Sequence, residues 1–162
     1  MTENQRTIHA SPDAVWRVLS DGWLYPLWVV GATRMRDVDA DWPAPGSRLH
    51  HSAGVWPLII NDETTCETLE PQRRMRLRAK GWPLGEADVV IELEPIGDGG
   101  GHGGAAGETV VRIHEDAATG PGRLLPGVVR SPLIKWRNSE SLRRLSFLAE
   151  GRAEGGTPTE AH

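Results

Sequence analysis

Short strand-like runs separated by turn signals occupy most of the chain from Thr33 onward. Proline and glycine interrupt strands, because proline lacks the N–H that a ladder needs and glycine weakens extended structure. The turn signals are the segments 42–46 (WPAPG), 56–57 (WP), 70–72 (EPQ), 82–85 (WPLG) and 97–107 (GDGGGHGGAAG). Their spacing predicts six antiparallel strands joined in sequence, a β-meander. Such a chain has to build its core on one face of a single sheet.

Two of the runs alternate strictly between apolar and charged residues, which indicates strands with one dry face and one wet face. Arg74, Arg76, Arg78 and Lys80 occupy the wet positions of one run, and acidic residues occupy most of those of the next. The hairpin between the runs predicts cross-strand ion pairs, each contributing about 0.2–1 kcal/mol. The inward-facing residues are expected to be Met75, Leu77, Ala79, Ala87, Val89, Ile91 and Leu93.

The last strong helical pattern runs from Ser131 to Leu148, and a serine followed by Pro132 is typical of a helix start. One stripe of this helix is apolar except for Asn138, which needs partners if it is buried, either in a packed structural bond or in a ligand. Trp136 and Phe147 form a second apolar side, which predicts contacts on two sides of the helix. The stripe consists of Ile134, Asn138, Ser141, Leu142, Leu145 and Leu148.

The first 30 residues contain a short strand candidate, Arg6–His9, and then two helical segments. Ser11 and Pro12 mark the start of a helix over Ala14–Ser20, and Trp23–Trp28 continues as a second short helix or turn. Strand, two short helices, six strands and a long helix make an α+β pattern.

Composition limits the classes of function. With 162 residues, 38% of them hydrophobic, the chain is expected to form one ligand-binding domain over 1–150, followed by a disordered tail over 151–162. A net charge of −4 disfavours nucleic-acid binding. Neither a secretion signal nor an 18-residue apolar run occurs, so we expect a cytoplasmic protein without a membrane span. Cys66 is the only cysteine and is expected to be a packed strand thiol.

Cofactor and metal motifs give no positive signal. Gly99, Gly101 and Gly104 form a GxGxxG pattern, but strand-like residues follow it, whereas a dinucleotide site needs a helix there. We therefore interpret this segment as a hairpin loop. The six histidines show no metal-ligand spacing, and we expect neither a metal nor a cofactor.

Five segments carry a resemblance to a known family that covers residues 5–149: IHASPDAVWRVLSD, YPLWVVGA, PAPGSRLHHSAG, ETTCETLEPQRRMRLRA and TVVRIHED. The chain resembles the helix-grip, START-like (SRPBCC) superfamily, and within it the polyketide cyclase and dehydrase-like proteins. The resemblance implies a seven-stranded curved antiparallel sheet wrapped around the C-terminal helix, with two short helices between strands 1 and 2 and a cavity inside. Members bind lipids, sterols, hormones or polyketides, and only some are enzymes.

Three connections are expected to meet at one end of the sheet, since successive turns of a meander alternate between its two edges. They are Gly54–Leu58, Gly81–Gly85 and Ala117–Arg130, and all three are unusually apolar for loops. This indicates a hydrophobic mouth or a partner-binding patch; alternatively the tryptophans plug the end of the core. The resemblance equates the first two with gate-like and latch-like loops. The rim candidates for ligand contact are Trp56, Leu58, Trp82 and Leu84.

Strand parity points His51 and Glu115 into the predicted cavity. Both could transfer protons there, and Asn138 could orient a carbonyl, as in aldol-type cyclisation or dehydration. The competing interpretation is structural: Glu115 pairs with an arginine near the strand end, and His51 and Asn138 satisfy core hydrogen bonds. The resemblance makes Trp28 a pocket wall. The remaining expected wall residues are Met75, Leu77, Ile134, Asn138 and Leu142.

The leading hypothesis from the sequence is binding of a small hydrophobic molecule, polyketide-like, aromatic or lipid-like, between the sheet and the last helix. The first alternative is an aromatase/cyclase or dehydratase that uses Glu115 and His51 as acid and base in the same pocket. The second is a co-chaperone-like interaction module that uses the apolar rim.

Overall fold

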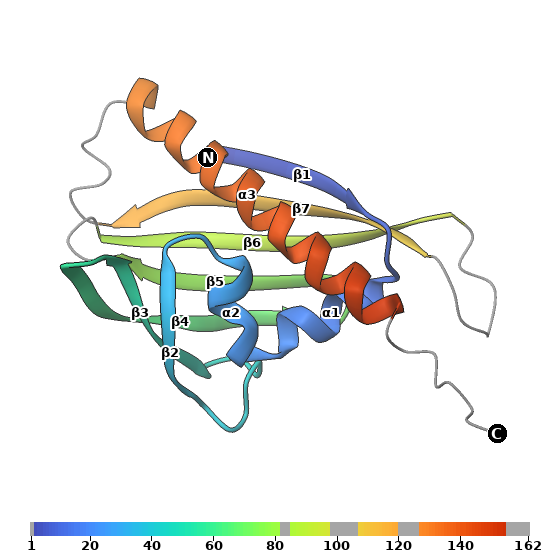
Figure 1. Ribbon diagram of the computed structural model, residues 1–162, viewed down its shortest axis with the longest axis horizontal. Helices are drawn as coiled ribbons and strands as arrows, with labels where there is room; N and C mark the ends of the chain where they lie inside the picture. The colour runs from blue at the N-terminus through green and yellow to red at the C-terminus, as the bar shows by residue number, and fades with distance from the viewer. Residues whose placement is uncertain (1, 82–84, 98–106, 120–126, 155–162) are drawn as a thin grey trace.

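A computed structural model describes residues 2–81, 85–97, 107–119 and 127–154 (Figure 1). The elements in chain order are β1 (Thr2–Ile8), α1 (Pro12–Ser20), the 3-10 helix η1 (Gly22–Leu24), α2 (Tyr25–Trp28), β2 (Ala32–Val38), β3 (Arg48–Val55), β4 (Leu58–Glu70), β5 (Arg74–Gly81), β6 (Gly85–Ile96), β7 (Glu108–Thr119) and α3 (Gly127–Glu154).

All seven strands form one antiparallel sheet in the order β1-β7-β6-β5-β4-β3-β2. The first strand therefore joins the last strand at one edge, and the meander completes the sheet. Figure 1 shows α3 running diagonally across the sheet, with α1 and α2 beside it over the β4 and β5 side. The predicted α+β helix-grip fold, with its curved sheet and short helices between strands 1 and 2, is confirmed.

The register of β5 and β6 explains the alternation in the sequence. Arg74 lies opposite Glu92, and Arg78 lies opposite Asp88. The ion pairs join Arg74 to Glu92 at 3.4 Å and Arg78 to Asp88 at 3.0 Å, as the charge pattern predicted. Met75, on the opposite face, is fully buried.

The start of α1 is also as predicted. Ser11 Oγ accepts a hydrogen bond from the amide of Ala14 at 3.2 Å, and Pro12 occupies the first turn. Val15 and Val18 are completely buried against the rest of the core. The short helices lie beside α3 on the same side of the sheet (Figure 1).

The predicted limits and surroundings of the last helix need correction. The helix begins at Gly127 rather than at Ser131 and ends at Glu154, so Pro132 lies inside it. Proline has no N–H, so the helix lacks one backbone hydrogen bond at this position. Trp136 and Phe147 are 63% and 59% exposed, so contacts on two sides were wrongly expected. The helix packs against one face of the sheet, and its opposite side faces solvent.

Most of the inner stripe of α3 is buried as the periodicity indicated: Asn138, Ser141, Leu142 and Leu145 are buried, and Ile134 and Leu148 are half-buried. Residues 151–154 of the expected tail are helical, while 155–162 and most of the glycine-rich loop lie outside the described residues. Cys66 is a free, fully buried thiol in β4. Among the described helices, none is long and apolar enough to cross a membrane.

Candidate ligand-binding cavity

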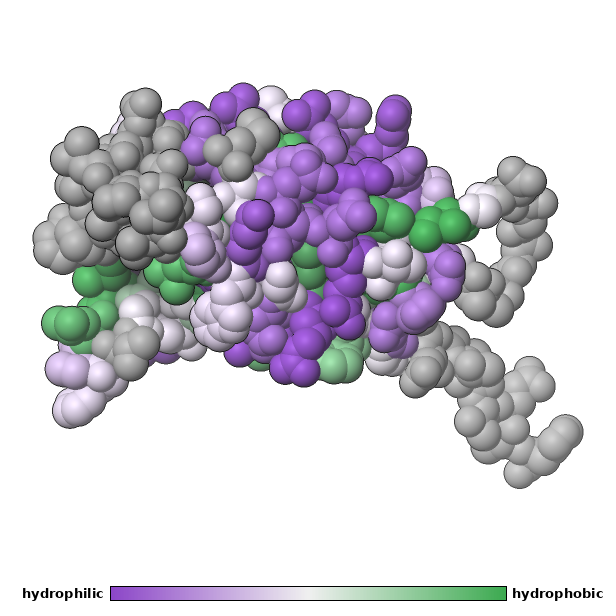
Figure 2. Space-filling view, turned by 90° about the horizontal axis from the view of Figure 1, so that it is seen from above, coloured by the Kyte–Doolittle hydropathy of each residue, from purple (hydrophilic) through white to green (hydrophobic). Residues whose placement is uncertain are grey.

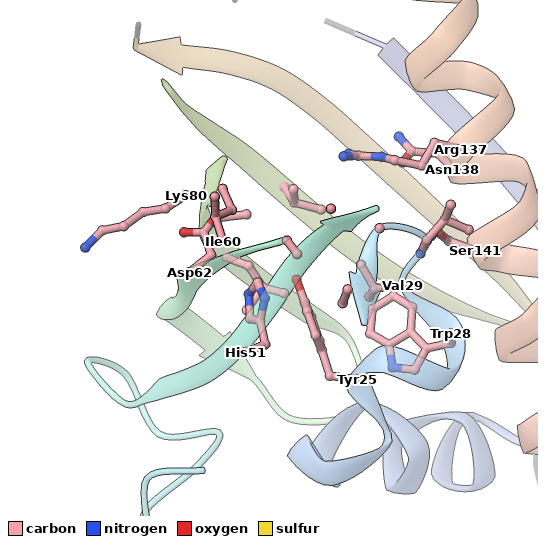
Figure 3. Close-up of a pocket in the computed structure, with 18 of the residues that line it drawn as sticks. Tyr25, Trp28, Val29, His51, Ile60, Asp62, Lys80, Arg137, Asn138 and Ser141 are labelled. Atoms are coloured by element: carbon pink, nitrogen blue, oxygen red, sulfur yellow. Dashed lines mark hydrogen bonds between the residues drawn. The ribbon is translucent and has the colours of Figure 1, made fainter. Parts of the chain in front are cut away.

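A cavity of about 580 Å³ lies between the inner face of the sheet and α3 (Figure 3). This volume falls in the usual range for small-molecule sites, about 300–1,000 Å³. Side chains from α2, the sheet and α3 line it, and most of them are apolar. The apolar lining includes Trp28, Val29, Val30, Ala32, Ala53, Pro57, Leu58, Ile59, Ile60, Leu77, Ala79, Val89 and Ile113. The polar and charged lining residues are Tyr25, His51, Asp62, Lys80, Glu115, Arg137, Asn138 and Ser141.

The structure brings only part of the expected site together. The site residues expected from the sequence that do line the cavity are His51, Glu115, Trp28, Leu58, Leu77 and Asn138. Met75 and Leu142 are buried in the core outside the lining, because their side chains fill the space between sheet and helices. Ile134 is partly buried and Trp56 is exposed, and neither lines the cavity. Trp82 and Leu84 lie outside the described residues.

His51 belongs to a buried hydrogen-bond chain. Its Nε2 lies 3.0 Å from Thr64 Oγ1, and that hydroxyl lies 3.1 Å from Tyr25 Oη. The Tyr25 and His51 rings are also in contact, with centroids 5.1 Å apart. Burial lowers the pKa of His51 and raises the pKa of Tyr25, since charging either group in this environment is costly. The neutral imidazole is therefore the stable form at neutral pH.

Asp62 faces the cavity beside His51. The two residues are directly opposite in the pairing of β3 with β4, so their side chains emerge on the same face of the sheet. Asp62 Oδ1 accepts a hydrogen bond from the amide of Glu63 at 2.8 Å. Asp62 Oδ2 and His51 Nδ1 are both buried and have no hydrogen-bond partner among the described residues.

Glu115 and Arg137 form the ion pair on the opposite side of the cavity. Both carboxylate oxygens of Glu115 accept hydrogen bonds from Arg137 Nη2. Glu115 is 4% exposed, whereas the side chain of Arg137 is 39% exposed. The structural interpretation of the sequence was that Glu115 pairs with an arginine near the strand end. The arginine that pairs with it, Arg137, comes from α3. The pair therefore ties β7 to the helix.

Asn138, one residue further along α3, is buried, and its Nδ2 has no hydrogen-bond partner among the described residues. Ser141, on the next turn, accepts a hydrogen bond from the amide of Val30 at 3.1 Å. That bond ties the helix to the segment after α2. Figure 3 shows Arg137 and Asn138 projecting from the helix on the side opposite His51 and Asp62.

Tyr25, Asp62, Thr64 and Arg137 were not among the residues expected in the site. The alternation of β4 contains a signal for two of them, because Asp62 and Thr64 share strand parity with the inward-facing Cys66. Tyr25 has no comparable local signal. Its position depends on how the short helix packs against the sheet.

One end of the cavity is bordered by the turn between β3 and β4. A β-carbon at Gly54 would lie 2.2 Å from the Leu58 carbonyl oxygen, and its φ of +114° also favours glycine. The turn presents apolar side chains, with Trp56 81%, Leu58 80% and Ile59 46% exposed. Figure 2 shows hydrophobic residues exposed at this end of the molecule. An exposed apolar rim next to a cavity is unusual for a turn.

No group of three or more His, Cys, Asp or Glu side chains within the described ranges is arranged to hold a metal ion. The polar lining instead consists of hydrogen-bonding side chains and the Glu115–Arg137 ion pair. Such an arrangement can orient an organic molecule or transfer protons to it.

Comparison with solved structures shows the same fold. A START superfamily protein from Mycobacterium smegmatis is 16% identical, with a TM-score of 0.61, over 96% of this chain and 98% of that one. A protein from Nitrosomonas europaea is 16% identical, with a TM-score of 0.63, over 94% and 95%. The di-domain ARO/CYC StfQ from the steffimycin biosynthetic pathway is 12% identical, with a TM-score of 0.66, over 94% of this chain and 51% of that one. No curated protein sequence matches significantly.

The sheet wrapped around α3 and the cavity between them form a helix-grip fold. The family model for polyketide cyclase / dehydrase and lipid transport matches residues 2–150. The chain belongs to this family, as the sequence resemblance predicted.

Proposed function

We propose that this protein binds a small hydrophobic molecule, polyketide-like, aromatic or lipid-like, in the cavity between the sheet and α3. The observation that carries the proposal is the cavity of about 580 Å³ with its mainly apolar lining. Burial of apolar ligand surface contributes roughly 25 cal/mol per Å², so such a lining favours an apolar guest over water. The family description and the ARO/CYC neighbour support the polyketide-like part of this class.

Titration of the intact protein with N-phenyl-1-naphthylamine, an apolar dye that fluoresces when it leaves water, tests the binding. We expect a saturable signal with one site per chain. Ala53→Trp should abolish it, since Ala53 lines the cavity and the larger ring would occupy it. The matched control is Thr65→Trp, on β4 with strand parity opposite to the buried Thr64, which should bind the dye like the wild type. Equal binding by both variants would contradict a site in the cavity.

Native mass spectrometry of freshly purified protein provides an independent measurement. A retained small molecule that Ala53→Trp loses and Thr65→Trp keeps would support the proposal.

Trp56→Ala distinguishes the two roles of the apolar rim. A gate predicts altered rates of dye uptake by this variant, whereas a co-chaperone-like surface predicts weaker partner binding with unchanged uptake.

Catalysis is the second candidate, favoured by the free ring nitrogen of His51. Burial lowers the pKa of His51, so its neutral form can accept a proton, and Thr64 and Tyr25 continue the hydrogen-bond chain. Glu115 has both oxygens bonded to Arg137, which makes it the weaker partner in the acid–base pair expected from the sequence. His51→Ala and Glu115→Gln should each abolish polyketide cyclisation or dehydration while dye binding persists. Unchanged turnover in both variants would exclude this role.

A further inference from the structure

Three polar side chains in the cavity wall are almost completely buried, yet each has an atom without a hydrogen-bond partner among the described residues. They are His51 Nδ1, Asp62 Oδ2 and Asn138 Nδ2, on side chains that belong to residues 4%, 5% and 4% exposed. Buried polar groups are nearly always hydrogen-bonded, because an unpaired one loses its bonds to water without replacement. All three residues line the cavity, so a bound molecule can supply the missing partners.

The other charged groups of the lining are already paired. Arg137 donates to both oxygens of Glu115, and Lys80 Nζ donates to Glu63 Oε2 at 3.1 Å. Figure 3 shows the Lys80 amine pointing away from the cavity. Recognition of a bound molecule therefore falls to the three unpaired atoms, one of which is the carboxylate oxygen of Asp62.

His51 and Asp62 form a pair suited to a hydroxyl group. Opposite residues on neighbouring strands have Cβ atoms about 4.5–5.5 Å apart, so one small group can reach both side chains. A carboxylate oxygen accepts a hydrogen bond, and a hydroxyl can donate to it. The same hydroxyl can accept from His51 Nδ1–H when Thr64 donates to Nε2. In this tautomer, with the proton on Nδ1, a ketone cannot satisfy Asp62, and an ammonium group cannot accept from His51.

Asn138 calls for the complementary group on the helix side. Its Nδ2 only donates, so its partner is an acceptor such as a carbonyl oxygen. Between this amide and the β3–β4 pair, the wall is built from apolar side chains that include Ile60, Leu77, Val89 and Ile113. The body of the ligand between its two polar ends is therefore apolar.

We propose that the ligand is a hydroxy-ketone with an apolar body, its hydroxyl bound by His51 and Asp62 and its carbonyl oxygen bound by Asn138. This inference rests on the proposed function, because it assigns the polar contacts of the same cavity. Such a ligand differs from a plain hydrocarbon or fatty chain by two hydrogen-bonding groups, which face opposite walls of the cavity.

Matched probes on two scaffolds of different length test the proposal with the wild-type protein. The short series is 6-hydroxy-2-acetylnaphthalene, 2-acetylnaphthalene, 2-naphthol and 2-ethylnaphthalene, and the long series is testosterone with its analogues lacking the hydroxyl, the ketone or both. Affinity is measured by displacement of N-phenyl-1-naphthylamine. In at least one series, each missing group should weaken binding about tenfold, the equivalent of one hydrogen bond.

Variants then assign each group to its wall. Asp62→Asn should weaken the hydroxy-ketone about tenfold and leave the ketone without a hydroxyl unchanged. Asn138→Leu should weaken binding of the hydroxy-ketone about tenfold and leave binding of the analogue without a ketone unchanged. Glu67→Gln, on β4 outside the lining and paired with Arg78 at 3.0 Å, and Ser146→Ala, a buried residue of α3 outside the lining, are the matched controls and should change neither affinity.

The outcomes separate this inference from the proposed function. Equal affinity for the hydroxy-ketone and the hydrocarbon in both series would overturn the inference, because water would then satisfy the three atoms, while cavity binding would stand. Failure of the dye and every probe to bind would overturn the proposed function itself. Loss of group selectivity in Asp62→Asn and Asn138→Leu, with the controls unchanged, supports the assignment.

Discussion

Replacing Arg137 by methionine tests whether the helix–sheet ion pair stabilises the fold. Glu115 is 4% exposed, and both of its oxygens depend on Arg137 for hydrogen bonds. Removing one partner of a buried pair costs about 3–5 kcal/mol. The Arg137 side chain is 39% exposed, so water can partly replace it, and we expect a loss of about 2 kcal/mol in the free energy of unfolding. With a typical urea m-value of about 2 kcal/mol/M, the midpoint should fall by about 1 M.

Urea unfolding followed by the fluorescence of the seven tryptophans measures this change. Glu115→Gln should cost less, about 1 kcal/mol, because water can reach the guanidinium that remains. The double variant should be more stable than the sum of the two losses implies, by at least about 0.5 kcal/mol. Arg143→Met, which breaks the exposed pair with Glu140, is the control and should shift the midpoint far less. Additive losses, or a negligible shift for Arg137→Met, would refute the reasoning.

Three further predictions concern the core. Burial lowers the pKa of His51, so below pH 6.5 the unfolded chain binds more protons than the folded chain. The stability contribution of the neutral ring should be full above pH 6.5 and should fall by up to about 1.4 kcal/mol per pH unit until the pH has passed the folded-state pKa. In urea titrations, His51→Gln should remove this slope. Burial raises the pKa of the Cys66 thiol to about 11, so native protein at pH 8 should react with Ellman's reagent at least about a hundredfold more slowly than unfolded protein, and fast native labelling would contradict it. A β-carbon at Gly22 would lie 2.5 Å from a Leu49 methyl, so Gly22→Ala should cost about 1–3 kcal/mol by thermal unfolding, whereas Gly151→Ala, with nothing within 4 Å, should be neutral or stabilising.

Local patterns predicted much of the fold. The alternation in β5 and β6 identified the buried face, and Ser11 with Pro12 marked the start of α1. These features depend on neighbours in the chain, whose positions follow from the periods of strand and helix. Parity likewise pointed His51 and Glu115 inward, where the structure places them.

Contacts between distant segments could not be derived in the same way. The sequence contains Trp136 and Phe147 as an apolar stripe, but only the docking of α3 on one face of the sheet leaves them exposed. Similarly, Ser131 and Pro132 have the pattern of a helix start, yet α3 begins earlier in the chain, at Gly127. Long-range packing decides which side of α3 is exposed, because the periodicity of a helix alone does not show which stripe meets the sheet.

The sequence by itself determined the fold class, the family and the inward parity of His51 and Glu115. The tertiary structure decided what surrounds them: strand register places Asp62 opposite His51, and the docking of α3 places Arg137 on Glu115 and Asn138 in the facing wall. Strand parity is a property of each strand alone, whereas register and helix docking are properties of segments far apart in the chain. The chemistry of this cavity resides in those long-range pairings.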